Sequence, residues 1–294
     1  MAEQQPGDAG GSDDLAGHHE ELGGRTVNVI VDPGSGPPVI LISGCGMPSY
    51  AWDPVVRLLR GRELVRLDRP GLGGTPWPNH LPTLAEETAT LTELAEEHPG
   101  GVFVAHSMAS FHAEATIRRR PDLVAGLVMV DGSVEITPKR PVGEAAWLAL
   151  ARGAEWAAHA PPFAALGPIA DRITVTAQSR RRLLDRMDPR SLLTYSQADA
   201  VASVIAESAA YRRQAIDLTR VRVTSRWPAG LPVEVLTARR SGGQRSVEAQ
   251  RQLTALLGGH QTVLTDSRHL VMLDQPQAIA DAVWRVLATI QGTD

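Results

Sequence analysis

The chain has 294 residues, of which 43% are hydrophobic and 21% charged, as is typical of a globular protein with a sizeable core. A formal net charge of −4 gives no reason to expect nucleic acid or an anionic membrane as a partner. The single cysteine, Cys45, excludes an internal disulfide framework and a cysteine-rich zinc site. No apolar run in the sequence approaches the ~20 residues of a membrane span.

The first segment, residues 1–24, is rich in Gly, Asp, Glu and Gln and contains no apolar stretch like the core of a signal peptide. We therefore expect a disordered N-terminal tail and a cytoplasmic protein. The adjacent His18 and His19 have no other placed ligand near them in the sequence, which favours solvated side chains over a metal site.

Strands and helices alternate along most of the remaining chain. Apolar runs predict strands at 26–31, 39–42, 63–67, 102–105, 127–130, 233–237 and 261–264, with helices at 51–59, 84–97, 246–257 and 276–289. Between 133 and 227 we find only helical segments, at 143–158, 180–187 and 191–209. This order predicts an α/β fold with a doubly wound, mostly parallel sheet, formed by residues 25–132 and 228–294. Residues 133–227 are then an inserted helical cap.

A short apolar strand from Gly101 runs into Ser107, and a helical pattern starts directly after it. This layout is typical of a nucleophile elbow, in which a sharp turn crowds the residues two before and two after the serine. Here both positions, Ala105 and Ala109, are alanine, which matches a loosened G-x-S-x-G pattern. The alternative is an ordinary strand followed by a serine that caps the helix.

Ligands bind at the carboxyl ends of the strands in such sheets. The loop that follows the strand at 39–42 begins Ser43-Gly44-Cys45, and its small residues allow backbone N–H groups to face a cavity. The N–H groups of Met108 and Cys45 are our candidates for the two donors of an oxyanion hole. A reactive Cys45 thiol is the rival interpretation, but no histidine follows it in a recognised cysteine-protease pattern.

A serine nucleophile needs a general base. His269 is the best placed of the nine histidines, because it follows the last predicted strand and precedes the closing helix. His106, on the turn itself, is expected to pack behind Ser107.

Together these motifs, with the segment Asp68-Arg69-Pro70-Gly71-Leu72-Gly73, resemble the α/β-hydrolase superfamily over essentially the whole of residues 25–292. The resemblance implies the order serine, acid, histidine. It also places Ser43 where the family commonly has a histidine, a change that leaves backbone donors intact.

The position of the acid departs from the commonest family pattern. Many members carry an aspartate shortly after the strand at 233–237, but residues 238–244 contain no carboxylate. Some members supply the acid from the end of the preceding strand, where this chain has Asp131, which would orient His269. The alternative is that Asp131 only hydrogen-bonds its loop. The other candidate acids are Glu135, Glu248 and Asp266.

The resemblance implies a serine hydrolase, free of metal and cofactor, that cleaves an ester or lactone of a small, mainly apolar molecule through an acyl-enzyme on Ser107. The alternatives are a C–C bond hydrolase or lyase with the same triad, or a non-catalytic ligand-binding member. Epoxide hydrolases and dehalogenases are disfavoured, because those members carry a carboxylate where Ser107 stands. The sequence does not indicate an oligomeric state. We expect the substrate to contact Gly44 and the cap aromatics Trp147, Trp156 and Tyr195, with Phe163 and Tyr211 as further candidates.

Overall fold

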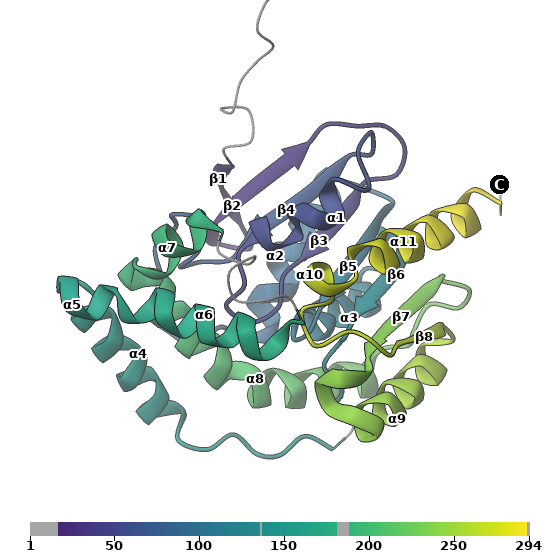
Figure 1. Cartoon of the computed structure of the whole chain (residues 1–294). Helices are drawn as coiled ribbons and strands as arrows, with labels where there is room; N and C mark the ends of the chain where they lie inside the picture. Colours follow the sequence, from purple (N-terminus) through teal and green to yellow (C-terminus); the bar gives the residue numbers. More distant parts are fainter. Residues whose placement is uncertain (1–16, 136, 181–187, 293–294) are drawn as a thin grey trace, which may run out of the picture.

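A computed structural model describes residues 17–135, 137–180 and 188–292 of the chain. Its centre is one eight-stranded sheet in the order β1-β2-β4-β3-β5-β6-β7-β8 (Figure 1). The strands are β1 His18–Leu22, β2 Arg25–Asp32, β3 Val39–Ile42, β4 Leu64–Asp68, β5 Gly101–His106, β6 Val124–Val130, β7 Val233–Ala238 and β8 His260–Leu264. β1, β2 and β4 pair antiparallel, and all other neighbours pair parallel. The predicted mostly parallel α/β sheet is thereby confirmed.

The sheet has an apolar layer on each face, because successive strand residues point to opposite sides. Ile40, Phe103 and Leu127 belong to one layer, and their neighbours Leu41, Val104 and Val128 belong to the other. Helices α2 Leu84–Glu97, α3 Ala109–Arg119 and α9 Arg239–Leu257 cover the first layer. Helices α1 Asp53–Val56 and α11 Pro276–Gln291 cover the second (Figure 1).

The predicted tail is wrong at its C-terminal end, because residues 18–22 form the edge strand β1. The strand turns through Gly23 and Gly24, which both have positive φ, and returns as β2. Only Leu22 of this strand is buried. Edge pairing uses backbone groups rather than apolar side chains, so the polar sequence concealed the strand. The rest of the predicted tail, residues 1–16, lies outside the described residues.

The described residues between β6 and β7 form five helices: α4 Glu144–Ala158, α5 Pro161–Ala164, α6 Leu166–Gln178, α7 Pro189–Tyr195 and α8 Ala198–Thr224. The described residues of this stretch contain no strand. The predicted helix at 191–209 is in fact two helices, α7 and α8, and the predicted helix at 180–187 falls almost wholly outside the described residues. The long helix α8 packs against α4 and also against α2 and α3, so it joins the inserted helices to the core.

The helices that follow β3 and β8 are short. The predicted helix at 51–59 is a 3-10 turn at Ser49–Trp52 followed by the single turn of α1. The chain after β8 forms the short helix α10, Val271–Asp274, before α11 begins.

None of the helices in the described ranges combines the length and the apolar content needed to cross a membrane.

Candidate active site

Ser107 occupies the turn between β5 and α3, with a positive φ of 53°. Its N–H donates to the carbonyl of Val130, and its own carbonyl accepts from the N–H groups of Ser110 and Ser133. These bonds hold a backbone conformation that non-glycine residues rarely adopt. Its flanks, Ala105 and Ala109, are fully buried. The N-cap position of α3 is Met108, so Ser107 does not cap this helix.

The structure brings Ser107, His269 and Asp131 together in one hydrogen-bonded line. Ser107 Oγ lies 2.9 Å from His269 Nε2, and His269 Nδ1 lies 2.6 Å from Asp131 Oδ2. The three residues come from three different parts of the fold, the end of β5, the end of β6 and the loop after β8. Both ring nitrogens of His269 are therefore engaged, one by an acceptor and one by the serine hydroxyl.

Asp131 is held firmly in this arrangement. Its φ is 42°, and its second oxygen, Oδ1, accepts hydrogen bonds from the backbone N–H of Ala238 and from Gln250 Nε2, both at 3.0 Å. Burial raises the pKa of Asp131, but hydrogen bonds from His269, Ser241 and the Ala238 N–H outweigh it and lower the pKa below the usual value. The carboxylate consequently stays ionised beside the imidazole.

The other candidate acids point elsewhere. Glu135 accepts from the Tyr211 hydroxyl, Glu248 pairs with Arg251, and Asp266 pairs with arginines at 180 and 240. Among the described residues, Asp131 is the carboxylate that hydrogen-bonds His269.

Gly44 brings the loop after β3 against the nucleophile. A Cβ atom at this position would lie 2.6 Å from His106 Nδ1 and 3.0 Å from Ser107 Cβ. Only glycine therefore allows this close approach of backbone to the serine. Ser43, where the family commonly has histidine, accepts a hydrogen bond from Trp52 Nε1 at 3.1 Å.

His106 packs behind the triad. Its Nε2 donates to the carbonyl of His269 at 3.0 Å, an acceptor that fixes the proton on Nε2. The two imidazole rings lie 4.6 Å apart. Burial, together with the charge of His269, lowers the pKa of His106 to about 3, so this ring is neutral at working pH.

Sequence reasoning missed a buried ion pair that holds the loop after β3. Arg69 donates to the carbonyls of Ser43 and Gly44 at 2.6 and 2.5 Å, and to both carboxylate oxygens of Glu207 at 2.8 Å. Glu207, on α8, also accepts the Gly46 N–H at 2.6 Å. Burial lowers the pKa of Arg69, but the charge of Glu207 and its hydrogen bonds to the guanidinium together outweigh burial and raise the pKa above its usual range, so the guanidinium stays charged. The segment Asp68–Gly73 contributed to the family resemblance, but no role was predicted for Arg69. No sequence pattern indicated Glu207.

Cys45 is not an activated thiol. Its sulfur lies 3.3 Å from Ser208 Oγ. Burial, with the neighbouring charge of Glu207, raises the pKa of the thiol to about 12. A nucleophilic cysteine requires the thiolate, so the structure offers no support for the rival interpretation.

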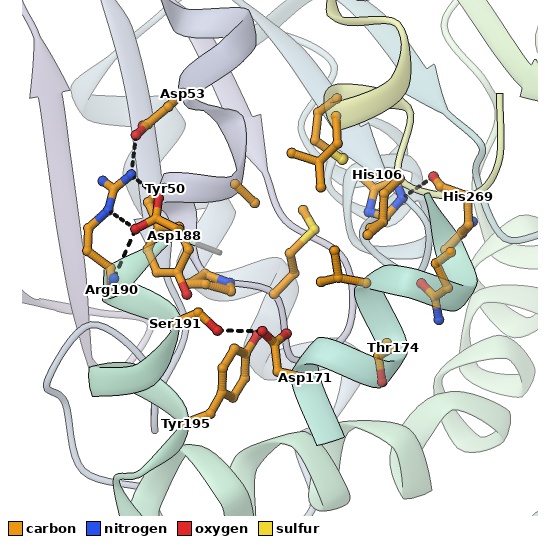
Figure 2. A pocket seen from close by; sticks show the side chains of 18 of the residues that line it. Tyr50, Asp53, His106, Asp171, Thr174, Asp188, Arg190, Ser191, Tyr195 and His269 are labelled. Atoms are coloured by element: carbon orange, nitrogen blue, oxygen red, sulfur yellow. Dashed lines mark hydrogen bonds and ion pairs between the residues drawn. The ribbon is translucent and has the colours of Figure 1, made fainter. Parts of the chain in front are cut away.

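A cavity of about 730 Å³ opens in front of Ser107 and His269. Cys45 and Tyr195 also line it, and the Tyr195 hydroxyl donates to the Gly46 carbonyl at 2.7 Å. Figure 2 shows the two histidines on one side of this cavity and a polar group on the other. That polar group consists of Tyr50, Asp53, Asp171, Asp188, Arg190 and Ser191. The wall of the cavity is therefore polar at this end.

Trp147 and Trp156, which were predicted to contact the substrate, lie outside this cavity. Their side chains are 45% and 81% exposed, and neither lines the cavity. Helix α4 instead turns its small residues Ala151 and Ala158 inward, and it packs against α8. Phe163 is likewise half exposed, and Tyr211 packs on Phe111.

No group of three or more histidine, cysteine or acidic side chains in the described residues is arranged to hold a metal ion.

Comparison with known proteins places this chain in a family. Residues 39–282 match the alpha/beta hydrolase family, and the chain therefore belongs to it. No curated protein matches the sequence.

Solved structures resemble the whole chain at low sequence identity. An α/β-hydrolase-fold protein from Burkholderia ambifaria is 18% identical with a TM-score of 0.71, covering 92% of this chain and 98% of that one. The Cif epoxide hydrolase from Acinetobacter nosocomialis is 15% identical with a TM-score of 0.70, over 95% and 90%. An N-formylmaleamic acid deformylase from Pseudomonas putida is 19% identical with a TM-score of 0.63, over 91% and 99%. At such identities the likeness shows the fold alone.

Proposed function

We propose that the protein is a serine hydrolase that cleaves a carboxylic ester or lactone of a small molecule through an acyl-enzyme on Ser107. The observation that carries this proposal is the continuous line from Ser107 Oγ through His269 to Asp131, with contacts of 2.9 and 2.6 Å. A serine hydroxyl is a weak nucleophile until a neighbouring base accepts its proton, and this geometry supplies the base and a group that orients it.

In the proposed first step, Ser107 Oγ attacks the carbonyl carbon while His269 Nε2 takes the hydroxyl proton. Asp131 stabilises the resulting imidazolium through Nδ1. The N–H groups of Met108 and Cys45 are the proposed donors to the oxyanion, and Arg69 and Glu207 fix the loop that carries Cys45. Collapse of the tetrahedral intermediate breaks the ester C–O bond, and His269 protonates the departing alcohol.

In the proposed second step, a water molecule attacks the acyl-enzyme carbonyl while His269 again takes the proton. The intermediate collapses, the Ser107 ester bond breaks, and the proton returns to Ser107 Oγ as the carboxylic acid leaves. In both steps His269 carries the proton between the attacking oxygen and the leaving group.

A fluorophosphonate probe tests the nucleophile directly, because it labels only activated serines. We expect labelling of the native protein and no labelling of Ser107→Ala. Ser208→Ala is a matched control, because Ser208 lines the same cavity but its hydroxyl donates to the Val204 carbonyl. Absence of labelling in the native protein would instead favour a non-catalytic ligand-binding member of the family. Labelling without turnover of any p-nitrophenyl ester would favour C–C bond hydrolysis.

A further inference from the structure

Asp171 is a carboxylate in the wall of the same cavity that holds the Ser107 hydroxyl. It projects from α6 beside α7, where its Oδ2 accepts a hydrogen bond from Ser191 Oγ. Figure 2 shows Asp171 and Tyr195 together across the cavity from His106 and His269. A molecule that fills the cavity therefore meets Ser107 at one end and Asp171 at the other.

The charge of Asp171 is not balanced by the described part of the chain. The two neighbouring carboxylates, Asp53 and Asp188, both pair with Arg190. Asp171 has hydroxyl groups near it, and no ion pair joins it to a described basic side chain. Burial raises the pKa of Asp171, and the nearby hydroxyls of Ser191 and Tyr195 offset only part of this effect. A partly buried carboxylate in this state gains most from a cationic partner.

A second polar atom at this end also lacks a partner. The hydroxyl oxygen of Tyr50 is buried and makes no hydrogen bond within the described residues, although Ser191 and Thr194 lie near it without hydrogen-bond geometry. The Tyr195 hydroxyl is already used by the Gly46 carbonyl, so it does not fill this need. Buried polar atoms are nearly always paired, and an unpaired one beside a cavity points to a ligand group.

We propose that Asp171 and Tyr50 form a binding subsite for a primary ammonium group of the substrate. A primary ammonium carries the missing charge and has three N–H donors, which match the carboxylate and the phenol oxygen. The aromatic face of Tyr195 suits a cation as well, whereas the Arg190 guanidinium already lies over the Tyr50 ring, 4.6 Å from its centroid. This inference rests on the proposed function and narrows it: the enzyme acts on esters whose acyl or alcohol part ends in an amine.

Matched esters test the subsite. p-Nitrophenyl 6-aminohexanoate and 8-aminooctanoate differ from the heptanoate and nonanoate only in a terminal ammonium in place of a methyl group. We expect the native protein to favour the ammonium esters in kcat/KM. Asp171→Asn should lower kcat/KM for the ammonium esters on the order of tenfold and leave the neutral esters unchanged. Asp281→Asn is the control, because it removes the same charge from the exposed side of α11, outside the cavity lining.

The two proposals fail in different ways. If neutral and ammonium esters lose activity equally in Asp171→Asn, or if the native protein shows no preference for ammonium, the subsite is refuted while the hydrolase remains. Calorimetric binding of hexylammonium, with 1-hexanol as the neutral comparison, tests the subsite without turnover. Binding that weakens about tenfold in Asp171→Asn supports the subsite even in an inactive protein. Equal binding in both proteins, or equal binding of the amine and the alcohol, overturns it.

Discussion

At the scale of single residues, the acid of the proposed triad, Asp131, lies at the end of β6. Its hydrogen bonds explain how a carboxylate at this position is oriented toward His269. The backbone of Asp131 is in the left-handed region, and one carboxylate oxygen is fixed by Ala238 and Gln250. The other oxygen is left for His269. At the position after β7, where many relatives carry the acid, this chain has Ser241, whose Oγ lies 3.5 Å from the same histidine nitrogen.

We predict that Asp131→Asn lowers the turnover of p-nitrophenyl butyrate by about 10³–10⁴-fold, because an amide favours the wrong tautomer of His269. Since Ser241 already reaches Nδ1, Ser241→Asp in the Asp131→Asn background should restore part of the lost turnover. The measurement is kcat for the native protein, the single variants and the double variant.

Asp266→Asn is the control for this experiment, because Asp266 is an exposed carboxylate paired with arginines and does not contact His269. Unchanged turnover in Asp131→Asn would remove Asp131 from the triad. A double variant as inactive as Asp131→Asn would show that a carboxylate after β7 cannot replace it.

At the scale of elements, helix α8 connects the inserted helices to the candidate oxyanion loop. Glu207 lies in the first half of α8, and its carboxylate binds Arg69 from the loop after β4 and the Gly46 N–H from the loop after β3. Both side chains of the ion pair are almost completely buried. A movement of α8 would therefore displace the loop beside Ser107 directly, through the contacts of Glu207 with Arg69 and the Gly46 N–H.

We predict that Glu207→Gln lowers the free energy of unfolding by about 3–5 kcal/mol, because it leaves the Arg69 guanidinium buried without a counter-charge. We also expect kcat to fall, since the Ser43–Gly46 loop loses its support, whereas KM for a small ester should change less. Urea denaturation and p-nitrophenyl butyrate kinetics measure the two effects.

Asp217→Asn is the comparison on the same helix, because the Asp217–Arg220 pair is exposed to solvent. Its loss should cost less than about 1 kcal/mol. If Glu207→Gln behaved like Asp217→Asn in both measurements, the ion pair would have no role in holding the loop.

The sequence predicted those elements whose side chains alternate with a clear period. Helix α2 was predicted with its observed bounds, Leu84–Glu97, and in the structure Thr83 and Glu86 form a capping box at its start. Edge strand β1 was missed because backbone groups make its pairing, and its mostly polar side chains show no apolar pattern. Helices α5 and α6 were missed because α5 has a single turn and α6 has no buried residue among its thirteen.

In the candidate site, too, the residues marked by local sequence motifs were predicted, and those that depend on contacts distant in the sequence were not. Ser107, His269 and Asp131 were found because each follows a strand and local motifs mark that position. The partnership of Arg69 with Glu207 joins residues 138 apart in the sequence, and no local pattern records such a contact. The direction of the tryptophans on α4 also depends on packing, because small residues make the closer fit against α8.

At the scale of the whole molecule, two buried histidines make the stability of the fold depend on pH. His106 lies behind the triad, and His112 lies inside α3, where its Nε2 contacts Gln214 at 2.7 Å. Burial lowers the pKa of both imidazoles below their usual range, to about 3 for His106. The folded protein therefore keeps the His106 ring neutral in mildly acidic solution and disfavours protonation of His112, whereas the unfolded chain protonates both rings below pH about 6.5.

The free energy of unfolding should consequently fall as pH falls from 7.5 to 5.5, because the unfolded state then binds more protons than the folded state. His106 contributes a loss of about 1.4 kcal/mol over this interval, and its loss continues until pH approaches about 3, whereas His112 adds a loss in the same direction. Urea denaturation at the two pH values, followed by circular dichroism, gives the difference. His106→Gln keeps a donor for the His269 carbonyl but cannot titrate, so its pH difference should be smaller by about 1.4 kcal/mol. An unchanged difference in this variant would show that His106 has the same pKa in the folded and the unfolded protein.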